Sequence, residues 1–336
     1  MNFGEFGGLV ILPIMPGTGK LAAGIRGPAE RPLVAPASPP PSIPTDPSVA
    51  TFRGAMTVPP VEKETALVAW FREHGSALVG FSGGVDSAYL ACVAVSALGA
   101  DRVLAVIGRS PSYPAEQWAR AREVADRFAV PVLELDTHEL DDPRYAANPV
   151  NRCYFCKTEL WSQLLPVAQA RGLAVVVDGT NADDLSDHRP GRTAADEHGV
   201  RSPLAELGFT KDDIRALSKA RDIPTWAQPS SPCLSSRLPY GTAVTPLRLA
   251  KVEAAERALR QLGVTGNLRV RFYGDTARVE LDEQELVHWR EGVREQSLRA
   301  AVAGAGFRVV ELDLRGFRSG SLNGAAADPS TVEVLA

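Results

Sequence analysis

The sequence has few cysteines, no excess of basic residues and no long apolar run, and each absence excludes a class of protein. Four cysteines in 336 residues are too few for a disulfide framework. Acidic residues outnumber basic ones by 40 to 36, which argues against a broad nucleic-acid-binding surface. No apolar run reaches the length that spans a bilayer, and no basic stretch of a signal peptide is present. We therefore expect a cytoplasmic protein that binds neither membranes nor nucleic acid.

Composition divides the chain into four parts. Residues 1–58 are rich in proline and alanine, as in A-P-A-S-P-P-P-S-I-P-T-D-P, and are predicted to be a disordered tail. We also expect this tail to be dispensable. Met56 opens a segment that resembles a natural start, and a start site placed too far upstream would explain the tail. Residues 59–240 are predicted to form the main domain and 241–324 a smaller α/β domain that binds substrate or forms an oligomer. A flexible tail is expected at 325–336.

In the main domain, short apolar segments alternate with amphipathic ones. Strands are predicted at 77–81, 102–107, 130–135 and 173–177, and helices at 62–73, 88–98, 114–128 and 157–170. This alternation predicts an α/β fold with a Rossmann-like, doubly wound parallel sheet. In the smaller domain we expect a helix at 246–262, a hairpin around Gly274–Asp275, a helical stretch at 282–303 and a strand at 308–314.

The hexapeptide S-G-G-V-D-S (82–87) follows the first predicted strand and opens a helix. Gly83 and Gly84 let the backbone approach a ligand, and the free N–H groups of the helix start attract an anion such as phosphate. The lysine of the Walker pattern is absent. Asp86 beside phosphates implies Mg²⁺ between them. The alternative is a turn that only closes the strand–helix corner, with Asp86 as a helix cap.

This hexapeptide resembles the PP-loop of ATP pyrophosphatases. The resemblance implies that ATP is cleaved between its α and β phosphates, that a substrate oxygen is adenylated, and that pyrophosphate stays on the loop. The residues that would hold the pyrophosphate and Mg²⁺ are Ser82, Gly83, Gly84, Asp86 and Ser87. Other residues follow strands at the same sheet edge and are expected to border the nucleotide: Arg109, Ser110, Gly179, Thr180 and Asn181.

Three of the cysteines occur in polar motifs. Cys153 and Cys156 lie in N-R-C-Y-F-C-K, and Cys233 lies in P-C-L-S-S-R, whereas Cys92 lies on an apolar helix and is expected to be core. A structural zinc ion binds four ligands. No second Cys-x-x-Cys is present and the five histidines form no metal pattern, which argues against a zinc site. Three thiolates can hold three irons of a 4Fe–4S cluster and leave the fourth iron open. Two buried thiols, a zinc pair or a redox pair are the alternatives.

Several motifs occur in one order along residues 61–324: S-G-G-V-D-S, D-G-T-N-A-D-D, D-H-R-P-G, G-V-R-S-P-L-A-E, P-C-L-S-S-R, R-V-R and G-F-R-S-G-S-L-N. Together they resemble the LarE family, the ATP-dependent sulfur transferases of nickel-pincer nucleotide cofactor biosynthesis. The resemblance implies a pyridinium mononucleotide substrate whose carboxylates are adenylated and converted to thiocarboxylates. It also implies a homo-oligomer, with a hexamer as the first hypothesis.

The resemblance offers two sources of sulfur. Some members of the family sacrifice the cysteine of P-C-L-x-S-R, which becomes dehydroalanine, and others add two cysteines in N-R-C-x-x-C-K and hold a cluster that passes on a sulfide. This chain has all three cysteines, so we favour the cluster, while direct donation by Cys233 stays open. Arg237, four residues after Cys233, is expected to hold its sulfur as thiolate or to bind the acyl-adenylate.

Four charged residues are candidates for substrate binding. Arg269 and Arg271 are two apart on a strand, so they share a face and would suit the substrate phosphate, as the R-x-R of the family does. Glu280 on the partner strand would position the pyridinium ring or a metal. Arg189 in D-H-R-P-G would contact the nucleotide or the substrate. The alternatives are a solvated strand face for the two arginines, a surface acid for Glu280 and a loop salt bridge for Arg189.

Two other functions compete with the sulfur transferase. A PP-loop iron–sulfur tRNA thiolase would combine the same loop with three cluster cysteines, but the acidic balance and the lack of a recognisable RNA-binding appendage argue against it. A nucleotide-binding regulator that senses iron–sulfur status would show no turnover. Release of pyrophosphate on adding an acceptor separates an enzyme from a sensor, and the choice of acceptor separates the two enzymes.

Overall fold

The structure is a computed structural model that describes residues 58–185, 190–318, 320–323 and 332–335. The predicted tail before Val58, the start-site hypothesis at Met56 and the candidate Arg189 lie outside the described residues. Within the described ranges, no helix is both long and apolar enough to cross a membrane.

The first sheet has four parallel strands in the order β3-β2-β1-β4: β1 (Ala77–Gly80), β2 (Val103–Arg109), β3 (Val132–Asp136) and β4 (Val175–Val177). The chain builds outward from β1 to β3 and then returns to pair β4 with the other edge of β1. The order therefore reverses beside β1, and such a reversal opens a crevice at the carboxyl ends of the strands. The loop that follows β1 begins at this point.

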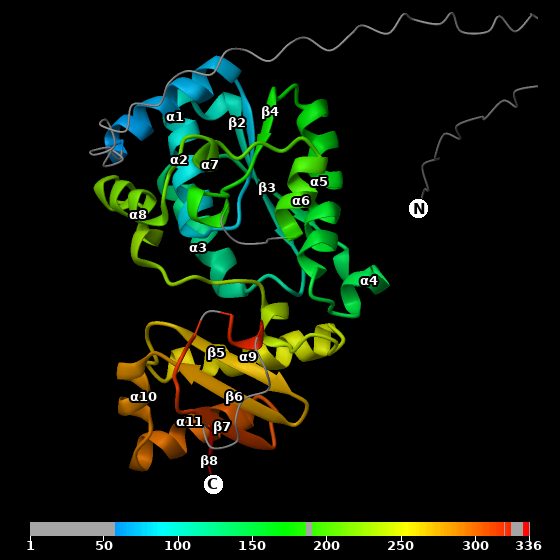
Figure 1. The fold of residues 1–336 in the computed structure, drawn as a ribbon, viewed down its shortest axis with the longest axis vertical. Coiled ribbons are helices and arrows are strands. Elements are labelled where there is room, and N and C mark those ends of the chain that lie inside the picture. The colour runs from blue at the N-terminus through cyan, green and yellow to red at the C-terminus, as the bar shows by residue number, and fades with distance from the viewer. Residues whose placement is uncertain (1–57, 186–189, 319, 324–331, 336) are drawn as a thin grey trace, which may run out of the picture. The chain divides into compact units, whose positions relative to one another are not determined.

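Both faces of this sheet are covered by helices, which confirms the predicted doubly wound α/β fold (Figure 1). Ala77 and Val79 of β1 face one layer of helices and Leu78 faces the other. The first layer contains α1 (Pro60–His74), α2 (Val85–Leu98), α3 (Ala115–Arg127) and α8 (Lys211–Ala220). The second contains α5 (Arg152–Ala170) and α6 (Pro190–Glu197).

Several short elements connect the longer helices and strands along the chain and were not predicted. They are α4 (Pro143–Ala146), α7 (Pro203–Glu206), η2 (Ala100–Arg102), η3 (Glu139–Asp141), η4 (Ala182–Leu185), η5 (Pro224–Ala227) and η6 (Leu234–Arg237). The helix α8 was also missed. It begins with a capping box, in which the Thr210 side chain accepts from the backbone N–H of Asp213 and the Asp213 carboxylate accepts from that of Thr210.

The second, smaller sheet has the order β5-β6-β7-β8: β5 (Leu268–Tyr273), β6 (Thr276–Leu281), β7 (Val309–Asp313) and β8 (Val332–Leu335). The predicted hairpin is confirmed, since β5 and β6 pair antiparallel with Arg269 opposite Glu280. Helix α9 (Pro246–Gln261) precedes this sheet, and η7 (Ser321–Asn323) follows β7.

The structure corrects the details of two predictions for this smaller sheet region. The helical stretch expected at 282–303 is two helices, α10 (Glu283–Trp289) and α11 (Gly292–Gly304). The break is at residues 290–291, and Gly292, with which α11 begins, has φ of +61°, a value that the interior of a right-handed helix does not allow. The flexible tail expected from residue 325 contains β8, whose backbone pairs with β7.

Candidate functional site

The loop after β1 can adopt its shape only with glycine at position 83. Gly83 has φ of +68°, and a Cβ built on it would lie 2.7 Å from the Cβ of Ala121 and 2.9 Å from the carbonyl oxygen of Gln117. The loop therefore packs directly on α3. Gly84 is the N-cap of α2, with no side chain over the first free N–H groups of the helix. These groups stay available to an anion.

Substituting Gly83 with alanine is expected to lower the free energy of unfolding by about 3 kcal/mol, from a left-handed backbone angle and from overpacking against Ala121. Gly75 is the matched control, because its φ is +80° and a Cβ there would meet nothing within 4 Å. Gly75→Ala should therefore cost only about 1 kcal/mol. Denaturant unfolding of both variants measures the difference, and equal losses would contradict the packing argument.

The peptide between Ser82 and Gly83 is held in one orientation. The carbonyl oxygen of Ser82 accepts hydrogen bonds from Nε2 of Gln117 (2.6 Å) and from the hydroxyl of Tyr113 (3.0 Å). Because the C=O and N–H of a trans peptide point in opposite directions, the N–H of Gly83 is directed away from these two donors. Ser87 closes the turn, since its hydroxyl accepts from the N–H of Ser82 (3.2 Å) and donates to the carbonyl of Gly84 (3.2 Å).

Asp86 does not cap α2, so the alternative role considered for it is wrong. Its carboxylate accepts from Nδ2 of Asn181 (3.3 Å) and forms an ion pair with Nζ of Lys211. Both charged side chains are partly exposed at the mouth of the loop. The site thus offers an oxygen ligand for Mg²⁺ and an ammonium for phosphate next to each other. Sequence reasoning missed Lys211 because it did not predict α8, whose first residue is this lysine.

The segment after β4 packs against the same loop, as its position at the sheet edge predicts. A Cβ on Gly179 would lie 2.9 Å from the backbone nitrogen of Ser87, so glycine is required for this contact. Asn181 is almost fully buried, and its Oδ1 accepts from the N–H of Asp183 (3.0 Å) while its amide reaches Asp86. Thr180 donates to the carboxylate of Asp178 through its N–H (3.0 Å) and its hydroxyl (2.9 Å).

Arg109 and Ser110 lie at the end of β2, on the predicted edge of the sheet. Their side chains bond to residues of β3 and of the following turn and make no hydrogen bond to the loop 82–87. The guanidinium of Arg109 pairs with Glu134 at 3.1 Å and lies 6.0 Å from the Trp118 ring. The hydroxyl of Ser110 accepts from the N–H of Ser112 (3.1 Å), which shapes the turn that follows.

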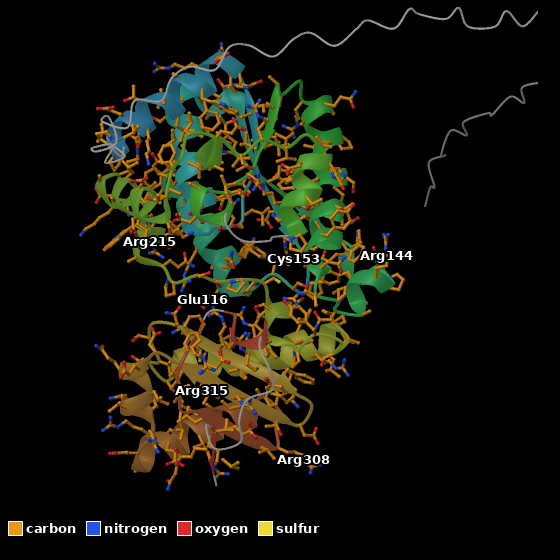
Figure 2. The ribbon with its side chains drawn as sticks, in the orientation of Figure 1. Glu116, Arg144, Cys153, Arg215, Arg308 and Arg315 are labelled. Atoms are coloured by element: carbon orange, nitrogen blue, oxygen red, sulfur yellow. The ribbon has the colours of Figure 1, made fainter. Side chains whose placement is uncertain are left out.

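The three thiols that the sequence singled out lie in one neighbourhood. Cys153 and Cys156 occupy the first two turns of α5, where Figure 2 labels Cys153, and Cys233 is the N-cap of η6. Burial raises the pKa of the Cys156 thiol, and the charges of Glu139, Cys233 and Cys153 raise it further against the opposing effect of Lys157. Across the described part of the chain, however, no three His, Cys, Asp or Glu side chains are arranged as metal ligands.

A ring of three buried hydroxyls includes one from the segment that carries Cys233. The hydroxyl of Tyr145 lies 2.7 Å from those of Ser112 and Ser235, which are 3.0 Å from each other. Burial raises the pKa of Tyr145, and the charges of Cys233 and Cys156 add to this effect. The tyrosine is therefore a neutral hydrogen-bonding group beside the thiols. No local pattern in the sequence marked Tyr145.

Arg237 is buried and fixes the backbone around Cys233. Its Nε and Nη2 each donate to the carboxylate of Glu256 at 2.9 Å, and Nη1 donates to the carbonyls of Pro232 (2.5 Å) and Cys233 (3.1 Å). Burial opposes the charged form, but Glu256 and the charge of Cys233 hold the pKa of Arg237 above its usual range. Glu256 was missed by the sequence analysis; it also accepts from the N–H of Val270 (3.0 Å).

The structure separates the roles of Arg269 and Arg271. Both are buried, with 4% and 5% exposed, and Glu280 is 2% exposed, so the surface alternatives are wrong. Arg271 donates to Oε2 of Glu280 from Nε (3.0 Å) and Nη2 (2.7 Å), and the hydroxyl of Ser321 donates to the other oxygen of Glu280 (2.8 Å). Arg269 bonds the carbonyls of Leu268 and Ser230 and has no ion pair with any described residue. Burial and the charges of Arg237 and Arg271 lower the pKa of Arg269 to about 10.

A cavity of about 300 Å³ lies against Arg269. Its charged lining residues are Glu116 (labelled in Figure 2), Arg120, Arg237, Glu256, Arg260 and Arg269. The pairs Glu116–Arg120 and Arg237–Glu256 are neutral. Arg260 donates to the carbonyls of Val264 (2.9 Å) and Gly266 (2.7 Å), so the lining carries two guanidinium groups without a carboxylate among the described residues. Such a cavity suits an anion of the size of phosphate.

Comparison with known proteins gave a partial match to a family model and to a solved structure. A family model described as NAD synthase matches residues 70–147. The glutamine-dependent NAD⁺ synthetase of Acinetobacter baumannii, solved in complex with ADP, has a TM-score of 0.44 and 23% sequence identity, over 51% of this chain and 36% of that one.

Two curated relatives match nearly their whole length. The uncharacterised protein slr1717 of Synechocystis is 43% identical over 254 residues, which are 76% of this chain and 94% of the relative. The pyridinium-3,5-bisthiocarboxylic acid mononucleotide synthase of Lactiplantibacillus plantarum is 37% identical over 261 residues, 78% of this chain and 94% of the relative. Identity at this level over so much of that synthase reflects common descent, and the chain therefore belongs to its family, the LarE family of PP-loop proteins.

Proposed function

We propose that the chain is an ATP-dependent sulfur transferase that converts the carboxylates of a pyridinium biscarboxylate mononucleotide to thiocarboxylates. The observation that carries the proposal is the loop 82–87, with Asp86 and Lys211 at its mouth, in a relative of a synthase named for a bisthiocarboxylic acid mononucleotide. The proposal includes cytoplasmic location and homo-oligomeric assembly, which stay predictions.

In the first step, a carboxylate oxygen of the substrate attacks the α-phosphorus of ATP, and the bond between the α-phosphorus and the bridging oxygen breaks. Pyrophosphate leaves, and an acyl-adenylate is formed. The negative charge that develops on pyrophosphate is stabilised by the amides of the loop and by Lys211. Asp86 would hold Mg²⁺, since its oxygens lie at the mouth of the loop and Mg²⁺ prefers carboxylate and phosphate oxygens.

In the second step, a sulfur nucleophile attacks the acyl carbon, and AMP leaves with the former carboxylate oxygen. Repetition on the other carboxylate gives the dithio product. A 4Fe–4S cluster held by Cys153, Cys156 and Cys233 would supply the sulfide. Cys156 packs against the same buried cluster as Leu234, the residue after Cys233, which supports a shared site. Thiolates are the ligands that iron–sulfur clusters use, while the described side chains are not arranged as metal ligands. In the alternative, the Cys233 sulfur displaces AMP and forms a thioester. Loss of the Cys233 α-proton with cleavage of the Cβ–S bond then releases the thiocarboxylate and leaves dehydroalanine.

The proposal is tested by pyrophosphate release with different acceptors. We expect release with the pyridinium biscarboxylate mononucleotide and none with tRNA or without an acceptor. Release with tRNA would favour the thiolase, and no release with either acceptor would favour a sensor. Formation of a thiocarboxylate, detected by mass spectrometry, completes the test.

Cys153→Ala is expected to reduce bound iron and acid-labile sulfide to background in protein purified without oxygen, because three thiolates anchor such a cluster. Iron analysis of the variant and of Cys92→Ala, a core cysteine on α2, measures this. Absence of iron from the unaltered protein after anaerobic reconstitution would contradict the cluster and leave Cys233 as the donor.

The two arginines of R-V-R should respond differently to replacement. Arg269→Gln is expected to raise the KM for the pyridinium substrate about 10- to 100-fold, because it removes a charged hydrogen-bond donor from the anion site. Arg271→Gln should instead lower the free energy of unfolding by about 3–5 kcal/mol, because it leaves Glu280 buried without its partner. Steady-state kinetics and denaturant unfolding measure the two effects. An unchanged KM in Arg269→Gln would contradict the assignment of the cavity.

A further inference from the structure

One short turn contacts both the pyrophosphate loop and the segment that carries Cys233. This turn is Ser110–Tyr113, which follows β2. On one side, the hydroxyl of Tyr113 donates to the carbonyl of Ser82 (3.0 Å). On the other side, the carbonyl of Ser112 accepts from the N–H of Leu234 (2.8 Å), the residue after Cys233. Two adjacent residues therefore connect the two reactive segments.

The turn has little freedom to change shape. The N–H of Tyr113 donates to the carbonyl of Ser110 (3.0 Å), and the N–H of Ser112 donates to the hydroxyl of Ser110 (3.1 Å). Pro111 and Pro114 restrict the backbone further, because their rings fix φ. A displacement of the turn at Tyr113 would therefore also displace Ser112.

The bonds on the Cys233 side are buried. Ser112 is 3% exposed, and its hydroxyl belongs to the ring of three hydroxyls with Tyr145 and Ser235. A buried polar network is costly to leave partly unsatisfied, so the ring favours a single position of the turn relative to Ser235. Since Ser235 is two residues after Cys233, this position also sets the backbone that carries the sulfur.

We infer that Ser112 and Tyr113 are positioning residues that align the Cys233 segment with the adenylate formed at the pyrophosphate loop. The inference rests on the proposed function. Neither residue supplies a reacting atom. When the alignment is lost, water attacks the acyl carbon of the adenylate before sulfur does, AMP leaves, and the carboxylate is regenerated. ATP is then consumed without formation of a thiocarboxylate.

The test is the ratio of thiocarboxylate formed to pyrophosphate released, measured in a single turnover with the enzyme in excess and sulfide present. Tyr113→Phe and Ser112→Ala should each lower this ratio about fivefold, the effect of one lost hydrogen bond. The ratio does not depend on the amount of folded enzyme, so a loss of stability alone would not change it. The double variant should be little worse than either single variant, because both act through one turn.

The matched controls are Tyr273→Phe and Ser297→Ala. Tyr273 is an exposed residue at the end of β5, and the hydroxyl of Ser297 donates to the carbonyl of Val293 within α11 (2.8 Å). Both controls should keep the ratio of the unaltered protein. Unchanged ratios in the Tyr113 and Ser112 variants, or fully additive losses in the double variant, would overturn the inference. Absence of pyrophosphate release from the unaltered protein would instead remove the proposed function, and the inference with it.

Discussion

Replacement of Asp86 by alanine is expected to lower substrate-dependent pyrophosphate release about 10³-fold, the scale of losing a preorganised charge in a transition state. The Asp86 carboxylate lies at the mouth of the loop and accepts hydrogen bonds from Lys211 and Asn181. Without it, Mg²⁺ would lose its protein ligand, and the charge that develops on pyrophosphate would be less well neutralised.

The fold should survive this substitution, because Asp86 caps no helix and its ion pair is partly exposed. Circular dichroism and the midpoint of thermal unfolding check the fold, and a coupled pyrophosphate assay measures the reaction. Asp212→Ala is the matched control: this acid is in the first turn of α8, next to Lys211, but has no bond to the loop. Normal pyrophosphate release from Asp86→Ala would remove Asp86 from the proposed site.

Cys233→Ala should separate the two half-reactions. Pyrophosphate release should continue, because Cys233 lies outside the loop, while thiocarboxylate formation should fall at least about 10³-fold, as expected when a reacting group is removed. The loss is expected with either sulfur source, since Cys233 is both a proposed cluster ligand and the alternative direct donor. Mass spectrometry of the nucleotide product gives the measurement.

Cys92→Ala is the matched control for this variant. Burial raises the pKa of the Cys92 thiol to about 12, so it is neutral and unreactive at pH 7. Cys92→Ala should lower the free energy of unfolding by about 1 kcal/mol, because it leaves a small cavity, and both half-reactions should stay intact. Detection of thiolated product from Cys233→Ala would remove this cysteine from the mechanism.

Local patterns were sufficient to predict the elements that carry the nucleotide site. The hexapeptide 82–87 joins a strand and a helix that are each marked by their own apolar residues, so strand, loop and helix could be placed from one stretch of sequence. The same holds for Gly179 and Asn181, which follow a strand of the same sheet. Parallel strands bring their carboxyl ends to one edge of the sheet, so the residues that follow these strands lie close together.

The partners of these residues could not be predicted, because they are distant in sequence and have no pattern of their own. Lys211 lies 125 residues from Asp86, and Glu256 lies 19 residues from Arg237 on a different element. Arg269 and Arg271 are equivalent by strand periodicity. Even the pairing of the strands would mislead, since Arg269 is directly opposite Glu280, whereas the diagonal neighbour Arg271 binds it. Side-chain packing decides this choice.

The hydrogen bond from Ser321 to Glu280 has a consequence for the synthesis of the protein. Ribosomes build the chain from its N-terminus, and Ser321 is translated 41 residues after Glu280. Until that hydroxyl arrives, one oxygen of a buried carboxylate lacks its donor, although Arg271 is already present. The nascent protein can therefore complete its nucleotide loop early, but the region around R-V-R reaches its final form only near the end of translation. Premature termination before Ser321 would leave a chain that retains the loop and lacks the finished form of the proposed substrate site.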